Sequence, residues 1–315
     1  MSERTAPDHE NTIHLLTDLT TKDGRRVGDL AVESISPRAA DKLYFRVLEG
    51  PRGKRPRQAE KVVAIARHAW KVVRRLYPEV FSAGKDKAEN PWVGVAKIKR
   101  KHAIKPHATR EEVYEFAWAA VEAGWAEVGA AAVICFEWLQ RPENVLAGYV
   151  SWTGYRSEKA PNAIRIIHHK TSKEVLHPLQ DTDGTLFYPE AEAILAKVPR
   201  LGVPVVLRQY YDGSGKIDVW TAMRINKDRV RPLREKLGLP LFTLDACRHG
   251  GMTELEEAEL TEGQGRALSG HATSAAYRRY AKATELRALG ATRKRHAHRL
   301  MTASMEEKVA PKAER

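Results

Sequence analysis

The sequence predicts a mainly α-helical protein of two domains that contains one small antiparallel β-sheet. Apolar residues recur at helical spacing between Ala59 and Val73, and a helix-start signature at Thr109 precedes two further apolar helices. Three short segments between residues 148 and 179 have the alternation and the β-branched residues of strands. A length of 315 residues is enough for two domains.

The first hundred residues predict an arm followed by a helical domain. Residues 1–30 are polar and weakly patterned, so we expect a loose arm. The helical domain covers 31–100, and its clearest helix runs up to Pro78. The basic run 52–57 before this helix is broken by glycine and proline, which predicts a loop. Such a loop could contact backbone phosphates, or it could be a solvated surface, and the sequence does not separate these alternatives.

A charged, proline-interrupted stretch predicts a linker over 101–106. It could lie along a polyanion or be a plain solvated connector. The second domain covers 107–300, and a frayed tail covers 301–315.

The second domain is predicted to be mostly helical around its small sheet. A capping box at Thr109 starts a helix that reaches about Glu122 and ends at Gly124. Asp245 is expected near the N-cap of a later helix. The remaining helices are expected at 125–140, 189–198, 221–237, 245–259 and 283–301, and the strands at 148–152, 163–168 and 175–179, with a turn at 170–174.

The charge of the chain narrows the class of partner. A formal net charge of +13 favours a polyanion, either nucleic acid or an anionic membrane surface. The chain has no apolar run long enough for a membrane helix and no basic amphipathic anchor, which leaves nucleic acid. The two cysteines, Cys135 and Cys247, are far apart, and the N-terminal residues lack a signal-peptide core. We therefore expect a cytoplasmic protein with reduced thiols.

The most informative stretch runs from Asp245 to Tyr280. It sets Arg248, His271 and Tyr280 in order, with Tyr280 nine residues after His271. These are the groups that can break a phosphodiester without a metal. A tyrosine can attack phosphorus, an arginine can neutralise the phosphate oxygens, and a histidine can donate a hydrogen bond to them.

This order resembles the C-terminal motif of the tyrosine recombinase (phage integrase) family. The nine-residue spacing selects Tyr280 over Tyr277 as the nucleophile. Residues 135–146 are similar to the family's first-arginine box, which places Arg141. Residues 166–173 are similar to the β-hairpin that carries the family's lysine, which places Lys170, with Lys173 as a competitor. The resemblance covers about the last two-thirds of the chain.

Two positions depart from the family pattern. Asp245 stands where the family usually has His or Lys, three residues before the second arginine. Asn144 stands where the family usually has an acid, three residues after the first arginine. A carboxylate beside a phosphate is repelled unless a cation or a proton compensates it. Asp245 could accept the tyrosine proton, or it could be a structural acid that orients Arg248.

The resemblance implies a two-domain DNA clamp, with a helical core-binding domain and a tyrosine-recombinase-like catalytic domain. It implies a site-specific recombinase or integrase that cuts and rejoins double-stranded DNA through a 3′-phosphotyrosyl intermediate. Arg141, Arg248 and His271 would bind the phosphate, and Lys170 would protonate the leaving 5′-oxygen. The family needs no metal and no nucleotide cofactor, and it acts as a homo-oligomer on DNA. A type IB topoisomerase-like enzyme and a catalytically degenerate DNA-binding protein of the same fold remain alternatives.

Overall fold

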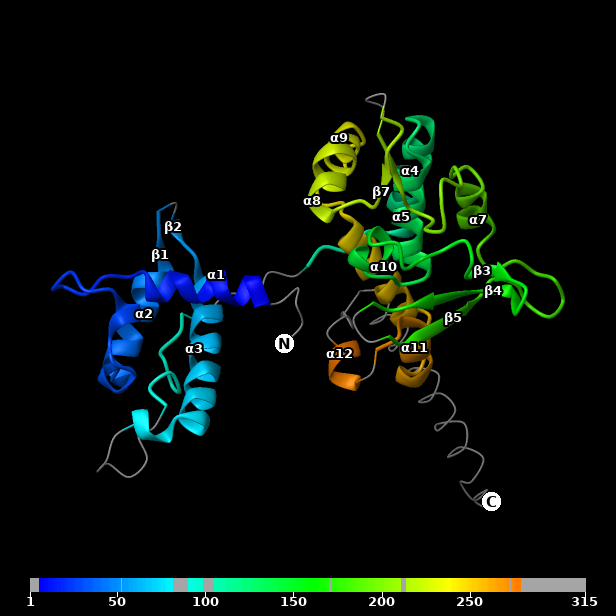
Figure 1. Cartoon of the computed structure of the whole chain (residues 1–315). Helices are drawn as coiled ribbons and strands as arrows, with labels where there is room; N and C mark the ends of the chain where they lie inside the picture. Colours follow the sequence, from blue (N-terminus) through cyan, green and yellow to red (C-terminus); the bar gives the residue numbers. More distant parts are fainter. Residues whose placement is uncertain are drawn as a thin grey trace, which may run out of the picture. The chain divides into compact units, whose positions relative to one another are not determined.

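The computed structural model describes residues 6–51, 53–81, 90–98, 105–169, 172–210, 214–271 and 273–278 (Figure 1). The protein is mainly helical with small antiparallel sheets, as the sequence predicts. It divides into two compact units, Met1–Ala103 and Ile104–Arg315. Lys170, Tyr280, the predicted helix at 283–301 and the tail at 301–315 lie outside the described residues.

Three helices form the first unit: α1 (Ala6–Thr17), α2 (Pro37–Leu48) and α3 (Pro56–Leu76). A proline is the first residue of both α2 and α3. The N–H at this position has no acceptor within the helix, so a residue without an N–H is well tolerated there. The core between the helices contains Tyr44, Val62 and Trp70. Short 3₁₀ turns lie at Val27–Asp29, Val32–Ser34 and Pro78–Val80.

The expectation of a loose arm over 1–30 is wrong for the described residues 6–30. Helix α1 packs against α3, and Leu16 and Val27 join the core of this unit. Thr12 is fully buried, and its hydroxyl donates a hydrogen bond to the Asp8 carbonyl oxygen. A few buried side chains therefore hold a segment whose overall polarity suggested disorder.

The described part of the basic run, 53–57, contains one strand of a hairpin and the start of a helix. Strand β1 (Glu49–Gly50) pairs with β2 (Gly53–Lys54), and α3 begins directly afterwards. The side chain of Arg55 folds back and donates a hydrogen bond to the Val47 carbonyl oxygen. The connection is therefore anchored to the end of α2.

The second unit is built around α5 (Ala126–Glu137), which is buried along almost its whole length. Helix α4 (Arg110–Glu122) packs against it, and Thr109 and Glu112 form the predicted capping box. Helix α10 (Leu244–Glu257) packs on α5 from another direction. Arg110 forms ion pairs with Glu137 and Glu254, so one guanidinium joins α4, α5 and α10.

The sheet of the second unit has the order β3-β4-β5 and is antiparallel. Its strands are β3 (Tyr155–Ser157), β4 (Ala160–Ile167) and β5 (Glu174–Pro178). The second and third predicted strands are confirmed, but the first, at 148–152, is wrong. Burial does not alternate along that segment, and within it only Ser151 forms a bridge, to Pro204. The Trp152 N–H donates to Val203 and the Val205 N–H donates to Val150 on either side of this bridge, and no further pair extends it among the described residues.

The remaining helices surround this core. The predicted helix at 221–237 is helical but is divided into α8 (Ala222–Ile225), a π-helical turn (Asn226–Val230) and α9 (Arg231–Lys236). Pro232 explains the wider turn, because it cannot donate to the preceding turn and its ring crowds the carbonyl four residues back. The other elements are α6 (Pro142–Leu146), α7 (Pro189–Leu195), α11 (Glu262–Ser269), α12 (Ser274–Arg278), β6 (Arg208–Gln209) and β7 (Ile217–Asp218).

No helix among the described residues is both long enough and apolar enough to cross a bilayer.

Candidate active site

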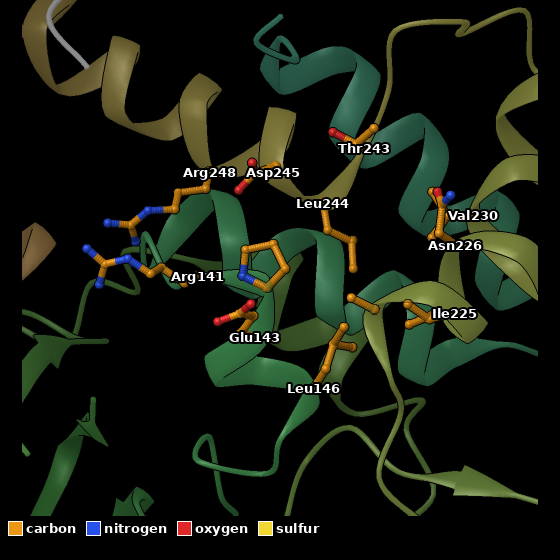
Figure 2. A pocket seen from close by; sticks show the side chains of 12 residues that line it. Arg141, Glu143, Leu146, Ile225, Asn226, Val230, Thr243, Leu244, Asp245 and Arg248 are labelled. Carbon is orange, nitrogen blue, oxygen red and sulfur yellow. The ribbon is translucent and has the colours of Figure 1, made fainter. Parts of the chain in front are cut away.

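A pocket of about 530 Å³ in the second unit brings together three of the residues that the sequence selected. Arg141, Asp245 and Arg248 all line it. Figure 2 shows the two arginine side chains extending in the same direction, away from the apolar part of the pocket. The lining residues are Arg141, Pro142, Glu143, Leu146, Ala222, Ile225, Asn226, Val230, Thr243, Leu244, Asp245 and Arg248.

Arg141 is placed by a sharp change of chain direction after α5. Leu139 has a positive φ of 54°, a conformation that side chains other than glycine seldom adopt. Arg141 is then the N-cap residue of α6, and Pro142 fixes the first turn of that helix. The side chain of Arg141 is half-buried, so its guanidinium remains accessible from the pocket.

Arg248 is placed by the close packing of α10 and is only 1% exposed. Two glycines, Gly250 and Gly251, follow shortly after it in the same helix. A Cβ on Gly250 would overlap the Ala108 carbonyl oxygen, and a Cβ on Gly251 would overlap that of Phe136. Only glycine lets α10 approach these neighbours so closely. The packing therefore fixes the position from which the Arg248 side chain starts.

His271 follows α11, where Gly270 ends the helix with a φ of 69°. Its Nε2 lies 3.5 Å from Nη2 of Arg248, and its Nδ1 lies 2.8 Å from the Ser269 hydroxyl. Burial, followed by the charges of Arg248 and Arg141, lowers the pKa of His271 to about 4. His271 is therefore a neutral imidazole at pH 7 in contact with a buried arginine.

Two further buried histidines lie on the inward face of the sheet. His168 follows β4 and His177 lies on β5, paired with Ile164. Burial is the main cause that lowers the pKa of His168 to about 4 and that of His177 to about 3. From the sequence, His168 is expected only as part of the hairpin motif. The alternation of Ile164, Ile166 and His168 on one strand face was the signal that could have placed it inside.

Asn144 joins the first-arginine segment to the hairpin. Its Nδ2 donates to Oε1 of Gln140 over 3.2 Å, and its Oδ1 accepts from the backbone N–H of His169 over 2.9 Å. A carboxylate could accept from His169 but could not donate to Gln140. The amide therefore suits this chain at a position where the family usually has an acid.

Asp245 differs from our expectation in two respects. The N-cap residue of α10 is Thr243, whose hydroxyl accepts from the Ala246 N–H over 3.0 Å, and Asp245 lies in the first turn of the helix. The two roles expected for it, as acceptor of the tyrosine proton or as the acid that orients Arg248, would also direct its carboxylate into the site, but the side chain is exposed. In Figure 2 the carboxylate lies at the start of α10, and both guanidinium groups extend away from it. A negative charge in the first turn is favourable toward the helix dipole, which accounts for an acid there.

Tyr277 is a packing residue. It is 2% exposed, packs with Leu139 and Met252, and its ring edge faces His271. Its hydroxyl points to Gly265, where a Cβ would overlap it. Lys170 and Tyr280 lie outside the described residues, so their places relative to Arg141, Arg248 and His271 stay predictions.

A second groove lies on α3 in the first unit and has a volume of about 580 Å³. Its charged side chains come from successive turns of one helix: Arg67, Lys71 and Arg74. Trp70 and Asn90 also line the groove, and Asn90 donates a hydrogen bond to the Arg67 carbonyl oxygen. This groove takes its cations from one helix, whereas the pocket of the second unit takes Arg141 and Arg248 from two different elements.

Comparison of the sequence with protein-family models and with curated proteins finds no match. The structure, by contrast, is similar to solved integrases. A lambda integrase dimer bound to a COC′ core site matches with a TM-score of 0.63 and 14% identity, over 90% of this chain and 72% of that one. The Tn1549 transposon integrase in complex with circular intermediate DNA matches with a TM-score of 0.64 and 14% identity, over 93% and 94%.

A lambda integrase tetramer bound to a Holliday junction matches with a TM-score of 0.62 and 14% identity, over 90% of this chain and 72% of that one. The similarity extends over most of both chains, although about six residues in seven differ. Both integrases are tyrosine recombinases. The chain therefore has the fold of the tyrosine recombinases.

Proposed function

We propose that this protein is a site-specific DNA recombinase of the integrase type. It would cut and rejoin double-stranded DNA through a 3′-phosphotyrosyl intermediate. The observation that carries the proposal is the convergence of Arg141, Arg248 and His271 within one unit of this fold. These residues come from three elements that are far apart in the sequence, and a motif match alone does not require them to meet.

The chemistry assigned to each residue follows from its functional groups. Two guanidinium groups can each offer a fork of N–H donors to phosphate oxygens and can neutralise the charge that develops on them. His271 would add a neutral donor or acceptor beside Arg248. Tyr280 would be the nucleophile, and Lys170 would protonate the 5′-oxygen that leaves.

Asp245 lines the same pocket, but its exposed carboxylate favours a structural role in the first turn of α10. A role as the base that accepts the Tyr280 proton is the alternative. Replacement by Asn separates the two, because Asn removes the base and keeps the shape. We expect Asp245→Asn to retain most cleavage activity.

DNA is the proposed partner, and the lambda and Tn1549 integrases were solved on DNA. The groove on α3 would contact backbone phosphates as part of a core-binding domain, because its cations lie in a row on one helix face. The lambda integrase structures include a dimer and a tetramer, so we propose a homo-oligomer on DNA for this chain as well.

A nicked suicide substrate tests the proposal. In such a duplex the short 5′-hydroxyl strand diffuses away after cleavage, so a covalent protein–DNA adduct accumulates. The native protein should form this adduct, Tyr280→Phe should abolish it, and Tyr277→Phe should retain it. Loss of the adduct in Tyr277→Phe alone would place the nucleophile one helical turn earlier.

The suicide substrate and a relaxation assay on supercoiled DNA separate the two alternative functions. DNA binding without any adduct would indicate a catalytically degenerate DNA-binding protein, an outcome that an acid at position 245 keeps open. Relaxation of supercoiled DNA without strand exchange between two sites would indicate a topoisomerase-like enzyme.

A further inference from the structure

His168 is a buried polar side chain that lies next to the turn carrying His271. It is 3% exposed, and its Nε2 has no hydrogen-bond partner among the described residues. Buried polar nitrogens nearly always have a partner, because an unsatisfied one keeps its desolvation cost. The ring lies at the end of the inward row of β4, where the hairpin turn begins.

The neighbours of His168 connect it to the two arginines. Its Nε2 lies 3.0 Å from the point where a Cβ on Gly270 would sit, so the ring packs against the turn that carries His271. Arg141 and Arg248 act on it electrostatically, and both also act on His271. His271, on the same turn, has its Nε2 3.5 Å from Nη2 of Arg248, so this turn links His168 to the buried arginine.

The charges around His168 are unbalanced. The charged groups that act on His168 are Arg141, Arg248, Lys173 and His169, and those that act on His271 are Arg248, Arg141, His168 and Lys173. Two acids, Glu143 and Asp245, line the same pocket as the two arginines, but both side chains are exposed. An anion bound beside Arg141 and Arg248 would add negative charge close to the buried guanidinium and the imidazoles.

We propose that His168 is part of the anion site, with its Nε2–H donating a hydrogen bond to an oxygen of a phosphate held by Arg141 and Arg248. The anion site stands on the geometry described here. That the phosphate is the scissile group of DNA rests on the proposed function. His168 would then add a donor from the sheet to those that the helices supply.

The alternative is that His168 only fills the space beneath Gly270. The two roles predict opposite results for His168→Leu, which removes the nitrogens and keeps an apolar side chain of similar volume. Replacing an unsatisfied buried polar group by an apolar one is neutral or stabilising in a space-filling role. In the anion site the same change removes a donor from the ligand.

Binding of inorganic phosphate tests the proposal without DNA or catalysis. Phosphate would be titrated into the full chain at pH 7, and the imidazole C–H resonances would be followed by NMR. We expect the His168 and His271 resonances to shift, and His168→Leu to weaken phosphate binding by about tenfold while the melting temperature is retained. His177→Leu is the matched control, since His177 is equally buried in the same sheet, and it should change the affinity by less than about threefold.

His168→Gln provides a second variant in case Leu impairs folding, because its amide N–H can replace the imidazole donor and should keep most of the affinity. Phosphate affinity that is the same in native protein, His168→Leu and His168→Gln would overturn the proposal, as would no shift of the His168 resonance.

Cleavage of the suicide substrate then tests the link to DNA. His168→Leu should slow adduct formation by on the order of 100-fold, the usual effect of removing one donor to a transition-state oxygen. If the native protein binds phosphate through His168 but never forms an adduct, the recombinase proposal fails and the anion site stands. If adducts form at the native rate in His168→Leu, the anion-site role of His168 fails and the recombinase proposal stands.

Discussion

The cations of the α3 groove and those of the pocket differ in how they are held. Arg67 and Lys71 project from one helix into solvent, one turn apart. Arg141 and Arg248 lie 107 residues apart in sequence, and Arg248 is fully buried. A row of exposed cations depends only on the helix that carries it, whereas the pair in the pocket comes together only after α5, α6 and α10 have packed. The first arrangement suits general attraction to phosphates, and the second suits the recognition of one phosphate.

The largest effect is expected when an arginine of the pocket is replaced by lysine, and the same replacement in the groove is the comparison. Arg248→Lys keeps the charge but loses the paired donors, so adduct formation should fall by roughly 100-fold or more. Arg67→Lys in the groove should change DNA affinity by less than about twofold, because an exposed phosphate contact needs only charge. Single-turnover cleavage and fluorescence anisotropy measure the two effects. Equal sensitivity at both positions would remove the distinction between the regions.

The next effect concerns the packing that places Arg248. Gly250→Ala should lower the free energy of unfolding by about 3 kcal/mol, because the added Cβ overlaps the Ala108 carbonyl oxygen. Gly263→Ala is the matched control, since this glycine is also helical and its nearest atom would be 4.0 Å away. The control should be neutral or slightly stabilising. Urea unfolding followed by circular dichroism measures both, and a similar loss in the two variants would indicate that the close approach of α10 is unimportant.

A third effect should follow from pH, and it belongs to the pocket. Burial lowers the pKa of His168 and His271 to about 4 and that of His177 to about 3, below their ordinary value near 6.5. At pH values between about 4 and about 6.5, these histidines are protonated in the unfolded chain but neutral in the folded protein. The free energy of unfolding should therefore decrease as the pH falls from about 6.5 to about 4, by up to about 1.4 kcal/mol per pH unit for each histidine.

Urea titrations across this pH range would measure the slope. His177→Leu should make it shallower, because one of the three buried imidazoles is removed. Inorganic phosphate should also make it shallower, since an anion favours the protonated rings. A stability that rises as the pH falls through this range would contradict the burial of neutral histidines.

The smallest effect is expected from the exposed row on α3. Replacing Arg67 and Lys71 by Gln should weaken DNA binding several-fold and should lower the salt dependence by about 0.9 in log–log slope for each phosphate that is no longer neutralised. Cleavage at saturating protein should be retained. Lys22→Gln, an exposed cation in a turn outside the groove, is the control. An unchanged salt slope in the double variant would exclude the groove from the DNA interface.

The parts of the fold that were predictable from the sequence are those that local chemistry determines. The Thr109 capping box marked the start of α4, and the continuous apolar run marked α5 as a buried helix. The strand at 148–152 failed because the types of residue in a segment do not supply a pairing partner, and only Ser151 of this segment forms a bridge, to Pro204. The helix at 6–17 was missed because only two of its residues are buried, too few to give a periodic pattern.

The site divides in the same way. Spacing selected Arg141, Arg248 and His271, and the structure brings all three together. The N-cap of α10 was misplaced because the residue three positions after Thr243 is Ala246, whereas a capping box would have Glu or Gln there. His168 could not be ranked as part of the site, since its contact with the Gly270 turn joins segments about a hundred residues apart.

An anion bound where these distant elements meet would also change the lifetime of the folded chain. A phosphate bound there would touch the start of α6, the end of β4, the middle of α10 and the turn after α11, and so it would fasten them to one another. A ligand that binds only the assembled site stabilises it by about 2.7 kcal/mol at a concentration of a hundred times its Kd. The protein released from DNA would therefore be the form that proteases degrade first, and its turnover in the cell would follow the occupancy of its target.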